Sequence, residues 1–444
     1  GTSMATPVVT GALAAIMGAA PSLKPEEAVA IMFETATNIG SEDLFGRGLL
    51  NLGAALSPVG TTSLALGNTT TGNAVGFAGS RVTVPARFAN SILEKLPSDL
   101  LILDKYKRGF AVPVESVIRP VGHSKQAFAD NLKSFTRYKK PVQVALSDKV
   151  SMRFSQNSSA FASNNLNGMG FDVGFNQNDL LNVSFSFTQN AKEGMENYFD
   201  QSLRNPFTSS ASDVYALKNV MKLTDRLDFA VSAAVGKNNF FDGNERLDYR
   251  DESGVQNGTV ALTYKAFENT NMTFSGGLLN EKGSVLGLNG SGAFDVPDSQ
   301  TYFMGVEVSS NPIKNLRLSA AYYYGTSKVG GNQSALMRLT NVESESLALN
   351  AQYALSKDTT LGLKGASPLY VRKASAAFDL PTARNATEDI VYRERMTVNL
   401  KSEAREWDMA VFGSHKVGDW TFQAEAMTRF NPDHQADVKN DYRL

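Results

Sequence analysis

The feature that most constrains this chain is the alternation of apolar and polar residues through its last three hundred or so residues. A period of two residues is typical of β-strands, because successive side chains point to opposite faces of a sheet. The alternation predicts strands with one apolar and one polar face. Representative apolar sets are Leu227, Phe229, Val231, Ala233 and Val235; Met272, Phe274, Gly276 and Leu278; Leu316, Leu318, Ala320, Tyr322 and Tyr324.

The strands are separated by turns that recur at a nearly constant interval. Short polar turns fall near Asn178, Asp225, Asn269, Lys314, Lys357 and Lys416, which are 47, 44, 45, 43 and 59 residues apart. Each interval holds two strands, one short turn and one long polar loop. Short turns at one end and long loops at the other are typical of an outer-membrane β-barrel. We therefore predict a mainly antiparallel β-barrel of about 12–14 strands over residues 141–444.

In such a barrel the apolar side chains face lipid and the polar ones face the lumen. Along the strand from Leu227 to Val235, the odd-numbered residues should face lipid, whereas Asp228, Ala230, Ser232 and Ala234 should line the lumen. Aromatic residues should form a girdle near the strand ends; the candidates are Tyr322, Tyr324, Trp407 and Trp420. A soluble β-sandwich also alternates, but it seldom separates short and long connections so regularly, and it stays open as the alternative.

The N-terminus carries a different signal, the heptapeptide Gly1-Thr2-Ser3-Met4-Ala5-Thr6-Pro7. Ser3 stands at the head of a nearly all-apolar or small run to Ala20, so its hydroxyl should lie at the start of a buried helix. Free backbone N–H groups and the helix dipole favour negative charge there, and the N–H of Ser3 could donate to an oxyanion. Pro7 should fall in the first turn, where its missing N–H costs no hydrogen bond. Ser3 is therefore a candidate nucleophile.

These residues resemble the serine box of the subtilases, the subtilisin-like serine peptidases. Two later segments keep the same order: Pro21 to Ala28, where Pro25 suits a first helical position, and the glycine-rich turn Phe45 to Asn51. Lys24 departs from the Ser or Thr that the family often has before that proline. The resemblance identifies residues 1–57 as the C-terminal part, with two helices, of an α/β subtilase catalytic domain.

The resemblance also implies what is missing. A subtilase triad runs Asp, His, Ser along the chain, so the triad His and Asp and the side-chain oxyanion donor would precede Gly1. The three histidines here, His123, His415 and His434, lie downstream in segments unlike that family. We expect Ser3 to be the nucleophile of a serine endopeptidase in the full-length protein, and this fragment to be inactive. Calcium, common in subtilases, cannot be located, and no other cofactor is identified.

Residues 58–140 read as a linker with short strands and a candidate pore helix. The segment Pro85 to Leu96 places Phe88, Ile92 and Leu96 at helical spacing, and residues 127–138 offer another short helix. For the basic run from Lys105 to Arg108 we favour a solvated turn over a contact with anionic lipid or an acidic surface.

Composition excludes several functions. The net charge of -1 leaves no basic excess for a nucleic-acid partner, and the absence of cysteine excludes disulfides and thiolate metal sites. No apolar run after the first helix approaches the length of a transmembrane helix. No His, Asp and Glu cluster has metal-ligand spacing. The carboxylates Glu343, Glu345, Glu403 and Glu406 read as loop or lumen charges.

Together, the three parts resemble a subtilisin-like bacterial autotransporter. That resemblance implies a twelve-stranded barrel in one chain, with its pore plugged by a helix from the linker, and a passenger carried to the cell surface. The last strand should begin at Asp441 to Leu444, so we expect truncation at the C-terminus. Expected partners are a protein or peptide substrate and outer-membrane lipid, with a monomeric barrel. The alternatives are an anchoring or translocation barrel without a proteolytic role, and a soluble, secreted β-rich adhesive domain.

Overall fold

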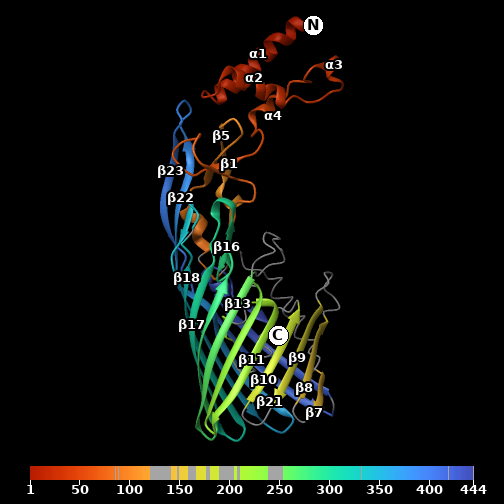
Figure 1. The fold of residues 1–444 in the computed structure, drawn as a ribbon, viewed down its shortest axis with the longest axis vertical. Helices are drawn as coiled ribbons and strands as arrows, with labels where there is room; N and C mark the ends of the chain where they lie inside the picture. The colour runs from red at the N-terminus through yellow and green to blue at the C-terminus, as the bar shows by residue number, and fades with distance from the viewer. Residues whose placement is uncertain are drawn as a thin grey trace.

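A computed structural model gives the fold of the chain. It describes all residues except 86, 89, 121–141, 148–149, 159–166, 177–180, 190–204, 208–210, 239–253, 332, 419 and 444, and for strands within 142–189 it describes the backbone pairing. Figure 1 shows three parts along the long axis: red helices at the N-terminal end, orange small sheets in the middle, and a large curved sheet below.

The N-terminal part is helical, because residues 1–57 are rich in alanine and other helix formers. Its first helix carries Ser3, and the N-terminus lies at the far end of the molecule from the large sheet (Figure 1). The helices are α1 (Thr2–Ala19), α2 (Pro25–Glu34), α3 (Glu42–Phe45) and α4 (Leu52–Leu56).

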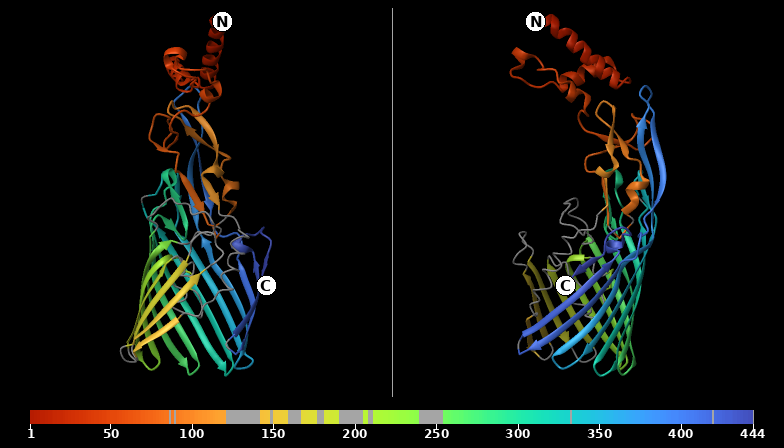
Figure 2. Two further views of the ribbon diagram at one scale, coloured as in Figure 1. Left: turned by 90° about the vertical axis from the view of Figure 1, so that its right-hand side faces the viewer. Right: turned by 180° about the vertical axis from the view of Figure 1, so that it is seen from behind.

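In the part of the chain that the structure describes, the large sheet has 15 antiparallel strands, and it curves into a barrel-like wall, which is clearest in Figure 2. We call it the barrel sheet. Its order runs from β26 to β7. The strands are β7 (Val142–Ser147), β8 (Val150–Ser158), β9 (Asn167–Asn176), β10 (Leu181–Gln189), β11 (Ala211–Thr224), β12 (Leu227–Asn238), β13 (Gly254–Phe267), β14 (Thr270–Glu281), β17 (Ser299–Ile313), β18 (Leu316–Val329), β20 (Val342–Ala354), β21 (Thr359–Lys373), β24 (Trp407–Val417), β25 (Trp420–Phe430) and β26 (Asp441–Arg443).

The mainly antiparallel fold predicted from the alternation is confirmed, and the sheet has one strand more than the 12–14 expected. The extra strand is β26, three residues that pair with Met427 to Arg429 of β25. The expectation that a strand begins at Asp441 is thus confirmed. Short turns join β11 to β12, β13 to β14, β17 to β18 and β20 to β21 at one end of the sheet, as their spacing predicted.

Three long connections at the other end that the structure describes, residues 282–298, 330–341 and 374–406, contain strands and 3-10 turns of their own. The interval of 59 residues contains the hairpin of β22 (Ser375–Arg384) and β23 (Val391–Asn399), inserted between β21 and β24. Figure 2 shows this blue hairpin rising beside the orange segment. The other elements are β15 (Ser284–Val285), β16 (Leu288–Ser291), η3 (Gly292–Phe294), β19 (Met337–Leu339) and the 3-10 turn η4 (Pro432–His434).

Residues 58–120 pack on these extensions, and we call the two together the upper unit. One apolar cluster joins Leu64 and Ile92 from the chain before the barrel to Phe294 and Phe378 from the barrel extensions. Strand β3 pairs with β16, which ties the two sequences into one sheet. The elements of this stretch are β1 (Ser63–Ala65), β2 (Ala74–Gly76), β3 (Arg81–Val84), η1 (Asn90–Lys95), β4 (Asp99–Leu103), β5 (Gly109–Pro113), η2 (Val114–Ser116) and β6 (Ile118–Pro120).

Two expectations for this stretch need correction. The predicted α-helix from Pro85 to Leu96 is a 3-10 helix over Asn90–Lys95. Its predicted apolar face, Phe88, Ile92 and Leu96, is buried, but in the upper unit, where η1 packs against β6 and β23. A short 3-10 segment suffices because tertiary burial, and not helical length, holds these side chains. The second predicted helix, residues 127–138, lies outside the described residues.

The basic run from Lys105 to Arg108 forms the predicted turn, but only part of it is solvated. Arg108 is 4% exposed and pairs with buried Asp104, whereas Lys105 is exposed and pairs with Glu34 of α2. Asp104 accepts backbone N–H bonds from Tyr106 and Arg108, which closes the turn. The run therefore serves the packing of the upper unit against the helices.

Candidate functional site

Ser3 lies in the first turn of α1 and is exposed. Gly1 is the N-cap, and its carbonyl accepts the N–H of Met4 at 3.0 Å. The first turn carries no acidic side chain. A hydroxyl placed there faces the positive end of the helix dipole, as the sequence predicted. The N-terminus of a helix suits a nucleophile, because it stabilises the negative charge that develops during attack on a carbonyl.

Pro7 lies inside α1 rather than in its first turn. The helix begins at Thr2, so Pro7 occupies the second turn, and it has no N–H to donate to the Ser3 carbonyl. The hydroxyls of Thr6 and Thr10 donate to carbonyls one turn earlier, at 3.2 and 3.1 Å. The expectation that Pro7 lies in the first turn, where its missing N–H costs no hydrogen bond, is wrong: Pro7 lies about one turn further into the helix.

Helix α1 was also expected to be buried, yet only Ala12 and Ile16 are. Ile16 packs with α2 and α4 in a small cluster around Ile31 and Met32. The described part of the chain supplies only this one stripe of partners, so the rest of α1 is exposed. Helix α1 is long and apolar enough to cross a membrane by length and mean hydropathy, a test that core helices of soluble domains also pass.

The segments that follow α1 have local structure that explains their sequence. Pro25 is the first residue of α2, and the carboxylate of Glu27 accepts the N–H of Lys24 at 2.9 Å. Glu27 thereby satisfies the N-cap backbone from N3, half of a capping box. Gly48 has φ +106°, and a Cβ at this position would overlap the carbonyl of Thr37. The glycine-rich turn is thus required where Thr37 pairs with Leu49.

Neither described histidine lies near Ser3. The Nδ1 atom of His415 lies 2.8 Å from the hydroxyl of Thr359 at the short-turn end of β24, and His434 accepts the N–H of Glu406 at 3.0 Å. Both belong to the barrel, whereas α1 lies beyond the upper unit (Figure 1). His123 is outside the described residues. Among the described residues no group of three or more His, Asp and Glu could hold a metal ion.

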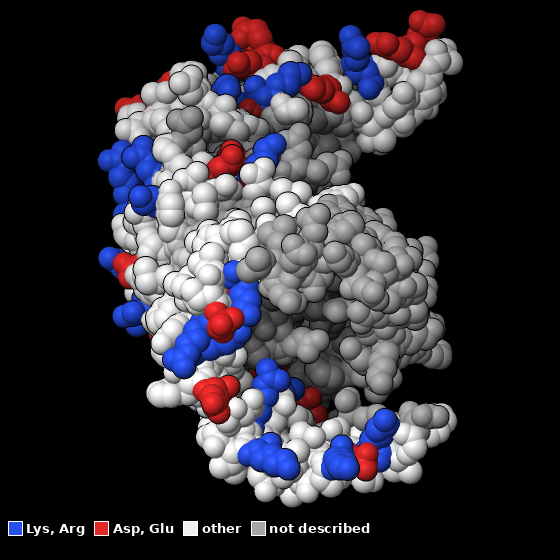
Figure 3. Space-filling view, turned by 60° about the horizontal axis from the view of Figure 1, so that its bottom comes forward, with Lys and Arg blue, Asp and Glu red and all other residues white. Residues whose placement is uncertain are grey.

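The second candidate surface is the outward face of the barrel sheet, which we call the outer wall. Residues that pair directly across antiparallel strands lie on the same face of a sheet. On the outward face the apolar side chains are exposed: Val231 by 40%, Met304 by 64% and Val411 by 57%. Further exposed apolar side chains of this wall are Leu217, Val235, Val260, Leu262, Phe274, Val306, Leu318, Leu349, Leu361, Leu363, Met409 and Phe422. In Figure 3 small red and blue groups are separated by wide white surface.

The opposite face carries small, polar and aromatic residues. Ala234 is 6% exposed, so the face assignment along β12 is as predicted from the alternation. Phe303 packs over Gly277 of the neighbouring strand and stacks on Phe207, with ring centroids 5.0 Å apart. These contacts fill the interior face near the long connections.

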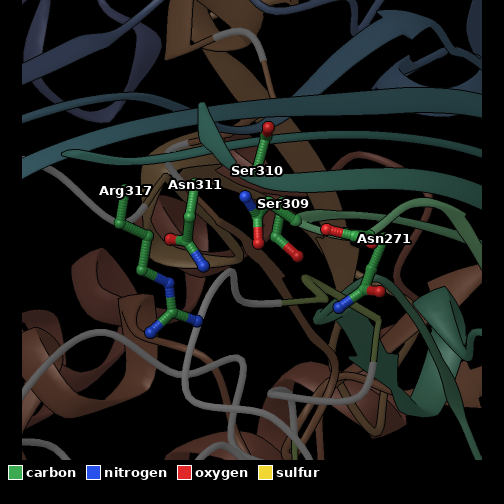
Figure 4. Close-up of a pocket in the computed structure, with 7 residues that line it drawn as sticks. Asn271, Ser309, Ser310, Asn311 and Arg317 are labelled. Atoms are coloured by element: carbon green, nitrogen blue, oxygen red, sulfur yellow. The ribbon is translucent and has the colours of Figure 1, made fainter. Parts of the chain in front are cut away.

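Near the short turns the same face is polar and hollow. A cleft of about 270 Å³ is lined by Glu268, Asn269, Asn271, Ser309, Ser310, Asn311 and Arg317. Figure 4 shows Arg317 and Asn311 on one side and Asn271 on the other. Amide, hydroxyl and guanidinium groups suit a hydrated lining, and the cleft has no pairing of nucleophile and base.

Two of the four carboxylates predicted as loop or lumen charges are on the outer wall. Glu343 and Glu345 belong to β20 and pair directly with Thr326 and Tyr324, which share the face of Met304. In β20 every second residue from Leu347 back toward the start of the strand stays on the outward face, but these residues are Glu345 and Glu343 instead of apolar ones. The other two behave closer to expectation: Glu403 accepts the N–H of Ser91, and Glu406 is buried against Arg429.

Comparison with known proteins adds one decisive finding. Residues 1–48 match the model of the subtilase family. This segment is a subtilase fragment. It contains Ser3, Pro25 and the turn through Gly48, the three features on which the resemblance was based. No curated protein matches the chain.

Several solved outer-membrane proteins overlay loosely on the chain. In-vitro folded OmpT, an outer membrane protein of Vibrio cholerae, is 14% identical with a TM-score of 0.36 over 68% of this chain and 95% of that one. The ferric yersiniabactin uptake receptor FyuA from Yersinia pestis is 11% identical, TM-score 0.30, over 59% and 52%. The FrpB iron transporter from Neisseria meningitidis is 11% identical, TM-score 0.30, over 83% and 68%. Scores this low add nothing to the argument.

The subtilase segment is fixed to the upper unit by polar contacts. The ammonium of Lys105 lies 3.0 Å from Glu34 of α2, and the hydroxyl of Tyr106 donates to the same carboxylate at 2.7 Å. The hydrogen bond from Tyr106, followed by that from Lys105, lowers the pKa of Glu34. Arg384 of β22 donates to the hydroxyl of Ser22 at 2.8 Å. The barrel hairpin therefore touches the subtilase segment directly.

Proposed function

We propose that the complete protein is a serine endopeptidase of the subtilisin type, held at the bacterial cell surface by its own outer-membrane β-barrel. The observation that carries the proposal is the presence, in one chain, of a subtilase nucleophile segment and an antiparallel barrel sheet whose outward face is apolar. The upper unit spans the distance between them (Figure 1).

In this proposal Ser3 is the nucleophile. Its Oγ attacks the scissile carbonyl while a histidine outside this chain takes the hydroxyl proton, and the oxyanion that forms lies at the N-terminus of α1. The N–H of Ser3 and the dipole of α1 favour the negative charge there. The oxyanion then collapses, the peptide C–N bond breaks, and the amine leaves with the proton that the histidine returns. Water hydrolyses the resulting ester, which releases the acid and returns Ser3 to its free form.

The barrel sheet supplies the anchor. In a bilayer every backbone polar group must be paired, so strands can cross only as a closed barrel. The exposed apolar outer wall suits lipid, whereas the polar cleft near Arg317 suits a watery interior. We propose a monomeric barrel with the short turns on the periplasmic side and the subtilase segment outside the cell.

The experiment is to replace Ser3 by alanine in the complete protein. Ser3→Ala should abolish peptide hydrolysis and labelling by a serine-directed phosphonate, with a loss of roughly three orders of magnitude or more. Surface display should be unchanged. The matched control is Ser41→Ala, which changes an exposed serine of the same segment and should leave activity intact. Residual activity of Ser3→Ala near that of the parent protein would refute the assignment.

The second candidate is an anchoring or translocation barrel without a proteolytic role, and the extent of the outer wall favours it independently of Ser3. It is separated by the same experiment: a complete protein that displays its N-terminal part but is not labelled by the phosphonate supports anchoring alone. A monodisperse, detergent-free protein would instead support the soluble β-rich domain.

A further inference from the structure

We propose that the outer wall carries a binding site for a phosphate-bearing lipid headgroup of the outer leaflet. The site is a group of cations and tyrosines at the long-connection end of β17, β18, β20 and β21, which we call the basic rim. It consists of Lys328, Arg372, Lys373 and Arg405 with Tyr302, Tyr322, Tyr324 and Tyr370. This inference rests on the proposed placement of the barrel in the outer membrane.

The register of the strands puts these tyrosines and lysines on the lipid-facing side. Tyr324 pairs with Met304, and Lys328, four residues further along β18, pairs with Gln300 of β17. Residues two apart on a strand share a face, so Lys328 points outward with Met304. The apolar side chains of the outer wall lie between these tyrosines and lysines and the short turns. The basic rim therefore lies where apolar wall gives way to polar surface.

One carboxylate of β20, that of Glu345, holds both arginines of the basic rim at this boundary. Glu345 accepts from Arg405, lies 3.3 Å from Arg372 and accepts the hydroxyl of Tyr322 at 2.9 Å. Arg405 also stacks on the ring of Tyr370, 4.3 Å from its centroid. A carboxylate with this many donors fixes the directions of both guanidinium groups.

The lysines are held more loosely and remain accessible. The ammonium of Lys373 is 3.5 Å from Glu343, yet its side chain is 75% exposed. The ammonium of Lys328 lies 5.3 Å from the ring centroid of Tyr302, a cation–π contact. Within the described part of the chain Lys328 has no ion pair. Four cations against two carboxylates leave the basic rim with an excess of positive charge.

The position of the basic rim and the chemistry of its side chains together indicate which ligand it binds. Side chains of aromatic residues mark the interface between hydrocarbon and headgroups in membrane barrels, and cations placed just above them meet the headgroups. Arginine forks suit phosphate oxygens, and mobile ammonium groups add charge. A phosphorylated lipid matches both the apolar outer wall and the basic rim. Its acyl chains would lie along Met304 and Val306, and its phosphate would contact the cations of the rim.

The test uses the complete protein purified in detergent and a bisphosphorylated lipid A as the probe, measured by native mass spectrometry and by titration. The variant is K328Q/R372Q/K373Q, which leaves Arg405 on Glu345 so that this buried carboxylate stays paired. Since each cation near a charged membrane surface contributes on the order of 1 kcal/mol, binding should weaken at least about tenfold.

The matched control is K314Q/K357Q/K416Q, which removes the same charge from exposed lysines in or beside the short turns and should bind the probe like the parent protein. A dephosphorylated form of the lipid should bind the parent protein about as weakly as the phosphorylated form binds the rim variant. Inorganic phosphate alone should not compete at millimolar concentration, because the acyl chains contribute.

Equal binding of the parent protein and the rim variant, or equal binding of phosphorylated and dephosphorylated lipid, would overturn the inference. If the triple variant does not fold, Lys328→Gln and Lys328→Arg replace it, with loss expected in the first and retention in the second. A protein that inserts into membranes but shows no phosphate preference contradicts only this inference, whereas a detergent-free soluble protein contradicts the proposed function itself.

Discussion

Arg108 and Asp104 form a buried ion pair, with Nη2 and Oδ2 2.8 Å apart. The same guanidinium donates to the carbonyls of Ala55 and Ser57, at 2.6 and 2.9 Å. It therefore joins the end of α4 to the turn between β4 and β5. Removal of one member of a buried pair leaves the other charge without compensation.

Arg108→Ala should destabilise this junction by about 3 to 5 kcal/mol, because Asp104 stays buried without its partner. The measurement is limited proteolysis across residues 50–110 at increasing urea. Lys105→Ala is the control; it breaks the exposed pair with Glu34 and should have little effect, because solvent screens an exposed ion pair. Similar urea profiles for the two variants would contradict the assigned role of Arg108.

Val231 and Ser232 test the faces of the barrel sheet. Val231 is 40% exposed and sits mid-strand in β12, and Ser232 points to the other face. Val231→Arg should cost roughly 2 to 4 kcal/mol if the outer wall meets lipid, and Ser232→Arg much less. The readout is the heat-modifiable folded band on gels. Equal tolerance of the two substitutions would remove the membrane interpretation of this strand.

Gly276 and Gly277 are neighbours with opposite surroundings. A Cβ at Gly277 would overlap the ring of Phe303, whereas a Cβ at Gly276 would meet only the Phe303 carbonyl oxygen, at 3.8 Å. Gly277→Ala should therefore destabilise the barrel by about 1 to 3 kcal/mol through overpacking. Gly276→Ala, its matched control, should be nearly neutral. Unfolding temperatures in detergent give the comparison, and the reverse order would show that Phe303 does not pack there.

His434 should make the barrel sensitive to acid. Burial, followed by the nearby charge of Arg87, lowers the pKa of His434 to about 4, and its Nδ1 accepts the N–H of Glu406. A folded pKa below the unfolded value of about 6.5 means that unfolding takes up a proton in acid. Above about pH 6.5 the histidine is neutral in both states and costs the folded barrel nothing. As pH falls from there toward about 4, the folded barrel loses stability relative to the unfolded chain.

His434→Gln should remove this part of the pH dependence, since an amide oxygen can accept the N–H bond without titrating. The measurement is the difference in unfolding temperature between parent and variant from pH 7.5 to pH 4. Glu406 is present in both proteins, so the difference between them reports on the histidine. A constant difference across this range would show that His434 is not held neutral by its surroundings.

The sequence by itself determined the strands, their faces and the position of Ser3. Those features are local: the side chains of Val231 and Ser232 alternate because the backbone does, and Ser3 heads α1 because an apolar helical run follows it. The interval between short turns likewise follows from strand length, which is fixed by the alternating segments.

Only the tertiary structure decided how segments distant in sequence meet. Phe88 and Ile92 looked like one face of a helix, yet they pack among barrel extensions some two hundred or more residues away, where a short 3-10 turn is enough. Glu345 and Arg405, 60 residues apart, meet on the outer wall because β20 and β21 are neighbours and the hairpin between β21 and β24 folds away above them. No local period encodes such pairings, since they depend on which strands lie side by side.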